Sequence, residues 1–210
     1  MRGRNLRIVI PGGSGQIGTL LAIHFREAGH DVSVLSRSPK PAPWREILWD
    51  GRTSGEWVSE LEGSDVCINL AGRTVNCRYG AANRRQIYDS RIVPTRLLNQ
   101  VIASLPHPPK LWLNASTATI YRHSLDKSMD EATGELGGNE PGAPETWNFS
   151  IRVAKDWEQA FFATSTPRTR KLALRSAVTF SADKGGIFAV LSNLTGRGLG
   201  GTNGTSVPDL

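Results

Sequence analysis

Short apolar runs alternate along this chain with longer segments in which apolar residues recur at helical spacing. The first run, from Leu6 to Ile10, is continuously apolar, which is typical of a strand buried on both faces of a parallel sheet. From Gln16 to Ala28 the apolar positions follow a helical period, and Gly29 offers a left-handed C-terminal stop. Val32 to Leu35 predicts a second strand. The chain is therefore expected to begin with one strand–helix–strand unit.

The same alternation continues beyond this unit. Further strands are predicted at Asp65 to Leu70, Leu111 to Ala115 and Leu172 to Val178, and further helices at Arg84 to Leu105 and Phe149 to Ala163. Loops are expected at Ser38 to Pro43, Pro106 to Lys110 and Gly134 to Glu145, the last being long enough to cover a site. Strands that alternate with helices predict an α/β fold with a doubly wound parallel sheet and right-handed crossovers.

A glycine-rich turn separates the first predicted strand from the first helix. Within "GGSGQIG" the spacing is GxxGxxG, through Gly12, Gly15 and Gly18. In a dinucleotide site the first glycine allows the tight turn, the second lets the backbone approach a diphosphate, and the third allows helix and strand to pack closely. Glycine is also the ordinary turn residue, so the position between strand and helix carries the prediction. The residues expected to bind the cofactor here are Gly12, Gly13, Ser14, Gly15, Gln16, Ile17 and Gly18.

The end of the second predicted strand distinguishes the two nicotinamide cofactors. An NAD site places an acidic side chain there for the ribose hydroxyls, whereas this chain has Ser36 and Arg37. A guanidinium can bind the additional phosphate of NADP through paired, charge-assisted hydrogen bonds. The sequence therefore favours NADP(H) over NAD; the alternative is that Arg37 is a solvated loop residue.

Composition excludes several classes of protein. The chain has 210 residues, 39% of them hydrophobic and 21% charged, and no apolar run approaches the roughly 18 residues of a membrane helix. The apolar run after the basic start is too short for a secretory signal, so we expect a cytoplasmic protein. Cys67 and Cys77 have no zinc-like spacing and are expected to be free thiols, with no metal site. The net charge of +6 comes from scattered arginines, which does not favour nucleic-acid binding.

Seven segments together carry a resemblance to a known family: "GGSGQIG", "VLSRSP", "ILWDG", "DVCINLAG", "YDSRIVPTRLL", "NASTATIY" and "LRSAVTFSADKGG". They cover nearly the whole chain in order. The sequence resembles the extended or atypical branch of the short-chain dehydrogenase/reductase superfamily, and most of all its nucleoside-diphosphate-sugar epimerase-like group. The resemblance implies that Leu70, Ala71, Gly72 and Ser90 contact the cofactor and that Asp50 lies beside the adenine. It places Thr117 where sugar epimerases have a catalytic serine or threonine.

The helix from Phe149 departs from the pattern of that superfamily. Its enzymes use a tyrosine as acid or base and a lysine four residues later, but alignment on Glu158 puts Ser150 and Ala154 in those places. Lys155 is one residue away, which rotates it by about 100° around the helix. A positioned acid or base contributes roughly 10²- to 10⁴-fold in rate, so ordinary carbonyl reduction would be crippled. Tyr121 is a candidate substitute proton donor; the alternative is that it only packs.

These observations lead to one expected function and one alternative. The chain is expected to be an NADP(H)-binding protein similar to an atypical sugar-nucleotide epimerase or reductase; the alternative is a non-catalytic NAD(P)-binding regulator or sensor. Its expected partners are a small-molecule substrate, either a nucleotide sugar or a carbonyl compound, and a second copy in a homodimer. Residues 1–180 are expected to form the Rossmann-type domain. Residues 181–210 would begin a C-terminal substrate-binding region that the resembled group continues and that is mostly missing here.

Overall fold

The computed structural model describes residues 4–124, 127–138, 140–180 and 187–199. In these ranges the strands are β1 (Arg7–Pro11), β2 (Asp31–Ser36), β3 (Arg45–Leu48), β4 (Val66–Asn69), β5 (Leu111–Thr117) and β6 (Arg170–Ser176). The helices are α1 (Gln16–Glu27), α2 (Val58–Leu61), α3 (Ala81–Ser104), α4 (Glu145–Phe162) and α5 (Ile187–Gly196), with a short 3-10 helix, η1 (Ala118–Ile120).

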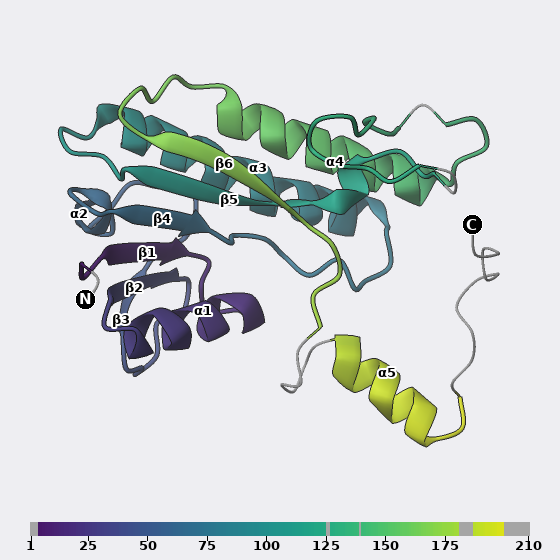
Figure 1. Cartoon of the computed structure of the whole chain (residues 1–210), viewed down its shortest axis with the longest axis horizontal. Coiled ribbons are helices and arrows are strands. Elements are labelled where there is room, and N and C mark those ends of the chain that lie inside the picture. Colours follow the sequence, from purple (N-terminus) through teal and green to yellow (C-terminus); the bar gives the residue numbers. More distant parts are fainter. Residues whose placement is uncertain (1–3, 125–126, 139, 181–186, 200–210) are drawn as a thin grey trace.

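The described strands form one parallel sheet in the order β3-β2-β1-β4-β5-β6 (Figure 1). The chain runs outward from β1 through β2 to β3, and then returns to lay β4 on the other side of β1. This is the doubly wound Rossmann order, in which ligands bind at the carboxyl ends of the strands where the order reverses. The fold class expected from the alternating pattern is confirmed, and the reversal lies between β1 and β4.

Helices cover both faces of the sheet, and the side chains of β1 point alternately to these two faces. Ile8 and Ile10 pack with Ala22 of α1 on one face. Val9 points to the other face, into a larger core with Trp112 of β5. Further members of that larger core come from α2, α3 and α4, namely Leu61, Leu97, Leu98, Val101, Ile102 and Phe161. Because both faces of β1 are covered, its residues must be apolar at successive positions, as the sequence pattern indicated.

Element boundaries differ from the predicted ones by a few residues. α4 begins at Glu145, directly after Pro144, one turn before the predicted start at Phe149. β6 ends at Ser176, where it pairs with Thr117 of β5, instead of at Val178. The sequence pattern missed β3 and α2 because β3 is a short, half-exposed edge strand and α2 has only four residues. Such elements form through backbone pairing and packing, without a long apolar period.

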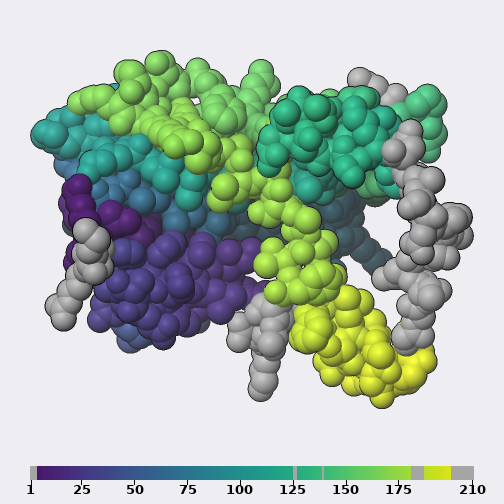
Figure 2. Space-filling model, in the orientation of Figure 1, coloured from purple at the N-terminus to yellow at the C-terminus, as the bar shows by residue number. Residues whose placement is uncertain are grey.

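Some expectations concern the C-terminal part and the cysteines. The predicted domain boundary at 180/181 falls at residues 181–186, which lie outside the described residues. α5 lies apart from the packed sheet and helices in Figures 1 and 2, and none of its side chains is buried.

Cys67 and Cys77 are free, as expected, and burial raises the pKa of the Cys67 thiol. Within the described residues, no helix is both long and apolar enough to cross a bilayer.

Candidate functional site

Gly12 and Gly18 are required by the fold of the turn itself. Gly12 has a φ of +74°, and a Cβ there would lie 2.7 Å from the backbone of Ala71. A Cβ on Gly18 would overlap the backbone of Gly13, so only glycine lets α1 pack this closely on the turn. These two residues hold the end of β1, the start of α1 and the segment after β4 together.

Gly15 is different, because nothing in the fold requires a glycine there. Its backbone is extended, with φ −81° and ψ 175°, and a Cβ would meet no atom within 4 Å. Gly15 is the N-cap of α1, without a side-chain cap and without an acidic residue in the first turn. The first helical bond runs from the Thr19 amide to the Gly15 carbonyl (2.9 Å), so the amides of residues 16–18 have no acceptor within the helix. Exposed amides at the positive end of a helix dipole bind anions.

The glycine turn opens into a cavity of about 740 Å³ at the carboxyl ends of the strands. The lining comes from α1, the segment after β4, α3, the end of β5 and one face of α4. Of the residues expected to bind cofactor or substrate, Gly12, Gly15, Gln16, Ile17, Gly18, Leu70, Gly72 and Thr117 line this cavity. The structure thus brings together residues from distant parts of the chain, over the point where the strand order reverses.

The other predicted cofactor residues lie outside the lining. Gly13 and Ala71 stand behind it as packing partners of the turn, and Ser14 is exposed. Arg37 is exposed just beyond β2, and no described residue forms a hydrogen bond or ion pair with its side chain. The hydroxyl of Ser90 accepts from the Arg73 amide (3.1 Å) and donates to the Ile87 carbonyl (2.9 Å). Ser90 therefore holds the segment after β4 in place through a hydrogen bond and is not part of the cavity lining.

Asp50 is occupied within its own loop. Its carboxylate accepts from the backbone amides of Thr53 (2.9 Å) and Arg52 (2.7 Å), and these bonds lower the pKa of Asp50. The loop after β3 is therefore held in a defined turn by a carboxylate that the resemblance places beside the adenine.

A buried polar network behind the cavity was not predicted from the sequence. The Asn69 side-chain amide donates to Asn114 (2.7 Å) and to Thr95 (3.2 Å), and its carbonyl accepts from the Ala71 amide (3.1 Å). The Trp157 indole also donates to Thr95 (2.9 Å). Since buried polar groups are costly unless paired, this network fixes the segment after β4 relative to α3 and α4. That segment is the one against which Gly12 packs.

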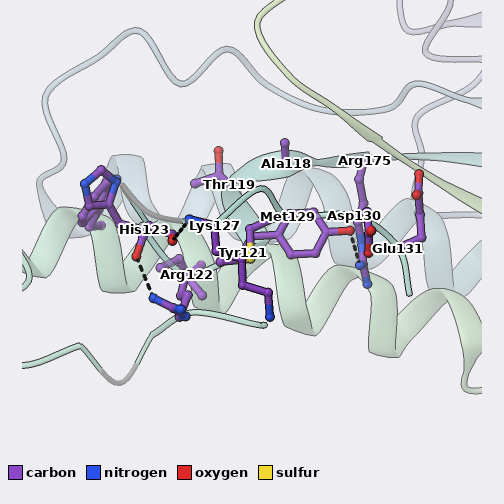
Figure 3. Close-up of a pocket in the computed structure, with 13 residues that line it drawn as sticks. Ala118, Thr119, Tyr121, Arg122, His123, Lys127, Met129, Asp130, Glu131 and Arg175 are labelled. Atoms are coloured by element: carbon purple, nitrogen blue, oxygen red, sulfur yellow. Dashed lines mark hydrogen bonds between the residues drawn. The ribbon is translucent and has the colours of Figure 1, made fainter. Parts of the chain in front are cut away.

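Figure 3 shows a second chamber, of about 580 Å³. It adjoins the main cavity, because Thr119 and Trp147 line both. Tyr121 lies here, with its ring 5.0 Å from the Arg175 guanidinium carbon, and its hydroxyl accepts from Arg175 (2.8 Å). No described residue accepts the proton of this hydroxyl. Thr117, which faces the main cavity, donates to the Thr119 hydroxyl (2.9 Å). The two candidate catalytic residues therefore lie in neighbouring chambers.

An ion pair between α4 and β6 anchors the second chamber. Arg175 donates to both oxygens of Glu158, at 2.9 and 2.8 Å, and Ser116 donates to the same carboxylate at 2.6 Å. Burial alone would raise the pKa of Glu158, but the hydrogen bonds from Arg175 and Ser116 outweigh it and hold the pKa below its usual value. The hydrogen bond to Glu158 raises the pKa of Arg175. Both groups are charged at neutral pH.

The face of α4 that lines the main cavity includes Ser150 and Ala154. The adjacent Lys155 is not part of the described lining, and its ammonium lies 3.6 Å from where a Cβ of Gly138 would stand. The offset expected from one residue of helical rotation is therefore present in the structure. The described lining of the main cavity includes Tyr79 but no lysine.

This sheet order, with a glycine turn at the reversal and a cavity above it, defines a Rossmann-type α/β protein as the class. The sequence profile of the NAD dependent epimerase/dehydratase family matches residues 8–143, and the chain belongs to this family.

Individual relatives agree with this assignment. Epimerase family protein SDR39U1 of Bos taurus is 31% identical over 203 residues, which is 95% of this chain and 63% of the relative. The crystal structure of human SDR39U1 (isoform 2) with NADPH is similar with a TM-score of 0.77 and 30% identity, covering 93% of this chain and 61% of that one. A nucleoside-diphosphate sugar epimerase from Corynebacterium glutamicum gives 0.74 and 26%, covering 96% and 39%. The chain thus spans less than two thirds of these relatives.

Proposed function

We propose that this chain binds NADP(H) in the main cavity and acts on a small molecule as an atypical epimerase or oxidoreductase. The observation that carries the proposal is the environment of Gly15, where unpaired amides at the start of α1 face an open cavity although the fold does not require a glycine. The residues present fit a diphosphate, because they offer backbone donors and no acidic side chain in the first turn. The NADPH in the crystal structure of human SDR39U1 supports the same cofactor here.

The preference for the phosphorylated cofactor is assigned to Arg37. Its side chain is exposed beyond β2 and has no described partner, so it is free to bind a phosphate. The neighbouring Ser36 carries no charge that would repel one, and its hydroxyl accepts from the Ser38 amide.

In this proposal the cofactor would supply hydride exchange, and the chain would position the substrate. Thr117 would turn its hydroxyl proton from Thr119 toward the substrate and so orient a carbonyl or hydroxyl group from the edge of the main cavity. Tyr121 would provide a proton from the adjoining chamber, where Arg175 holds its hydroxyl. A carbonyl compound or a nucleotide sugar is the proposed substrate class.

One observation favours a second candidate function, a non-catalytic NAD(P)-binding regulator or sensor. Ser150 and Ala154 line the cavity where the resemblance expects a tyrosine and a lysine. The diphosphate site depends on backbone amides of α1 and would bind the nucleotide without that pair. Turnover of NADPH by the full chain, with a panel of carbonyl compounds and nucleotide sugars, would exclude the regulator; binding without turnover would favour it.

The remaining expectations are part of the same proposal. Residues up to 180 would form the binding domain, and the residues that follow would begin a substrate-binding region. A homodimer stays a prediction, which light scattering would check. Two free thiols are typical of a reducing compartment, so the cytoplasm is the proposed location.

The substitution Gly15→Asp tests nucleotide binding. Aspartate is a favourable N-cap, so the folded state should be at least as stable as the parent. Its carboxylate would occupy the open space and repel the diphosphate, so NADPH affinity should fall by at least about 100-fold in calorimetry.

Gly80→Asp is the matched control. Gly80 is the uncapped N-cap of α3, with extended backbone and no atom within 4 Å of a Cβ, and it is not part of the described lining. This variant should bind NADPH like the parent. A parent chain that binds neither NADPH nor NADH, or a Gly15→Asp variant that binds normally, contradicts the proposal.

A further inference from the structure

The second chamber differs from the main cavity in the charge of its wall. In the main cavity, the charged residues of the described lining are Arg73 and Arg91, and neither pairs with a carboxylate among the described residues. That wall attracts an anionic ligand, in agreement with the nucleotide of the proposed function. The second chamber contains charged groups of both signs, and their pairing determines which ligand it can bind.

Each arginine and lysine in the described lining of the second chamber already has a carboxylate partner. Arg122 and Lys127 both pair with Glu135, at 2.6 and 3.3 Å, and Arg175 pairs with Glu158 at 2.8 Å. An additional anion would have to compete with these carboxylates for their partners. Within the described lining, no arginine or lysine is therefore free to bind a diphosphate.

Two further carboxylates add negative charge to this chamber, those of Asp130 and Glu131 (Figure 3). Asp130 accepts from the amides of Thr133 (2.6 Å) and Ala132 (3.0 Å), and its hydrogen bonds with Thr133 lower its pKa, so it is charged at neutral pH. Glu131 is exposed, and no described residue pairs with its carboxylate. Like charges repel, so the electrostatics of the chamber disfavour an anionic ligand.

The remaining lining offers apolar and aromatic surface. Trp147, in the first turn of α4, is 40% exposed, and its ring lies 5.3 Å from that of His123. Ala118, Met129 and Ile151 add apolar surface. Aromatic molecules stack on exposed indole rings, and the burial of their apolar surface is favourable. A chamber of about 580 Å³ is large enough for a molecule with two rings.

Two hydroxyl groups of the chamber can donate to a carbonyl oxygen. The Tyr121 hydroxyl accepts from Arg175 (2.8 Å), and the Thr119 hydroxyl accepts from Thr117 (2.9 Å). No described residue accepts the proton of either hydroxyl. A neutral carbonyl oxygen can accept such a proton without separating any of the ion pairs.

We propose that the second chamber binds an uncharged carbonyl compound with an aromatic body, and that nucleotide sugars are not its ligands. This deepens the proposed function, which left both substrate classes open, and rests on it. The aromatic body would stack on Trp147, and the carbonyl oxygen would accept from Tyr121 or Thr119.

A set of three probes separates the ligand classes on the full chain. Benzophenone is an uncharged aromatic ketone, para-benzoylbenzoate has the same body with one carboxylate, and UDP-glucose is a nucleotide sugar. Equilibrium dialysis measures the binding of each, with and without saturating NADPH. Benzophenone should bind at least about fivefold more tightly than para-benzoylbenzoate, and UDP-glucose should not displace it. Benzophenone is also a photolabel, so irradiation followed by peptide mass spectrometry should find it on the peptides that contain Met129 and Trp147.

Two pairs of variants test the residues involved. Trp147→Leu should weaken benzophenone binding by about 3- to 10-fold, because the stacking surface is lost. Its control is Phe162→Leu, which changes an exposed aromatic residue at the other end of α4 that lines neither described cavity and should bind like the parent. Glu131→Lys should bind para-benzoylbenzoate about two- to fivefold more tightly and leave benzophenone binding unchanged. Glu27→Lys, at the exposed end of α1, should change neither.

Several results would overturn the inference. They are para-benzoylbenzoate binding as tightly as benzophenone, displacement by UDP-glucose, labelling confined to peptides outside the chamber, and no binding of benzophenone. Equal losses in Trp147→Leu and Phe162→Leu would also overturn it. If the parent binds NADPH but not benzophenone, only this inference fails. If the parent binds no NADPH, the proposed function fails and the substrate assignment fails with it, even where benzophenone labels the chamber.

Discussion

Glycines of the same turn have different reasons to be glycine. Gly12 and Gly18 would clash with backbone if they carried a side chain, whereas Gly15 faces open space in an ordinary extended conformation. The first two are explained by folding alone. Folding does not explain Gly15, and the proposed function attributes it to a diphosphate that would approach from the cavity. At this scale, the surroundings of each missing Cβ identify the glycines that folding requires, and the position of Gly15 on the cavity lining distinguishes it from Gly80, which has equally open surroundings.

Arg37 allows a prediction about cofactor choice. Arg37→Met should weaken NADPH binding by about 10- to 100-fold, because one charge-assisted contact to a phosphate is lost, and should leave NADH binding nearly unchanged. Fluorescence titration with both nucleotides measures the ratio, with Arg96→Met as the control. Equal effects on both nucleotides would show that Arg37 does not read the additional phosphate.

At the scale of elements, one carboxylate of α4 joins this helix to the carboxyl-terminal parts of β5 and β6. Glu158 of α4 accepts from Ser116 of β5 and from Arg175 of β6, and Arg175 also donates to Tyr121 just after η1. The side chains of Glu158 and Arg175 are only 12% and 24% exposed, so solvent screens the pair weakly. The position of Tyr121 therefore depends on how α4 packs against the sheet.

Glu158→Gln should reveal this pair through pH. At neutral pH the variant should lose about 1–3 kcal/mol of unfolding free energy, because the buried guanidinium loses its counterion. The pKa of Glu158 is lowered in the folded state, so its contribution is present above the ordinary carboxyl pKa of about 4.3 and disappears as pH falls through the folded value. Urea unfolding from pH 7 to acid should show the two proteins converging as the pH falls below the ordinary carboxyl pKa and through the lowered pKa of Glu158. A constant difference would contradict the assignment.

At the scale of the whole molecule, the cavity joins the two halves of the sheet. Its lining combines α1, which packs on the β1–β2 half, with the ends of β5 and α4, which belong to the other half. A ligand bound there would contact both halves. Binding to the folded state alone must then stabilise the whole sheet.

This predicts a measurable linkage. NADPH at about 100 times its dissociation constant should raise the unfolding free energy of the parent by about 2.7 kcal/mol in urea titrations. Gly15→Asp should show an increase of at most about 0.4 kcal/mol, and Gly80→Asp should show the full one. A similar increase in all three proteins would place the nucleotide somewhere other than the glycine turn.

The boundaries of the first strands and helix could be predicted from the sequence, whereas the residue of α3 that lines the cavity could not. β1, α1 and β2 were predicted to within one or two residues because their apolar periods are uninterrupted and both faces of the strands are buried. Ser90 was predicted to contact the cofactor, yet its neighbour Arg91 is the one that lines the cavity. Adjacent helical positions differ by about 100°, and the rotation that decides between them is set by tertiary packing.

The sequence by itself determined the order of the longer strands and helices, the glycine turn and the absence of an acidic residue after β2, because these depend on local periodicity and residue identity. Tertiary structure alone decided that Arg91 lacks a carboxylate, that Glu158 holds Arg175, and that Thr117 and Tyr121 face different chambers. These features join residues far apart in the chain. Their distances follow from how helices pack across a sheet, which no local pattern encodes.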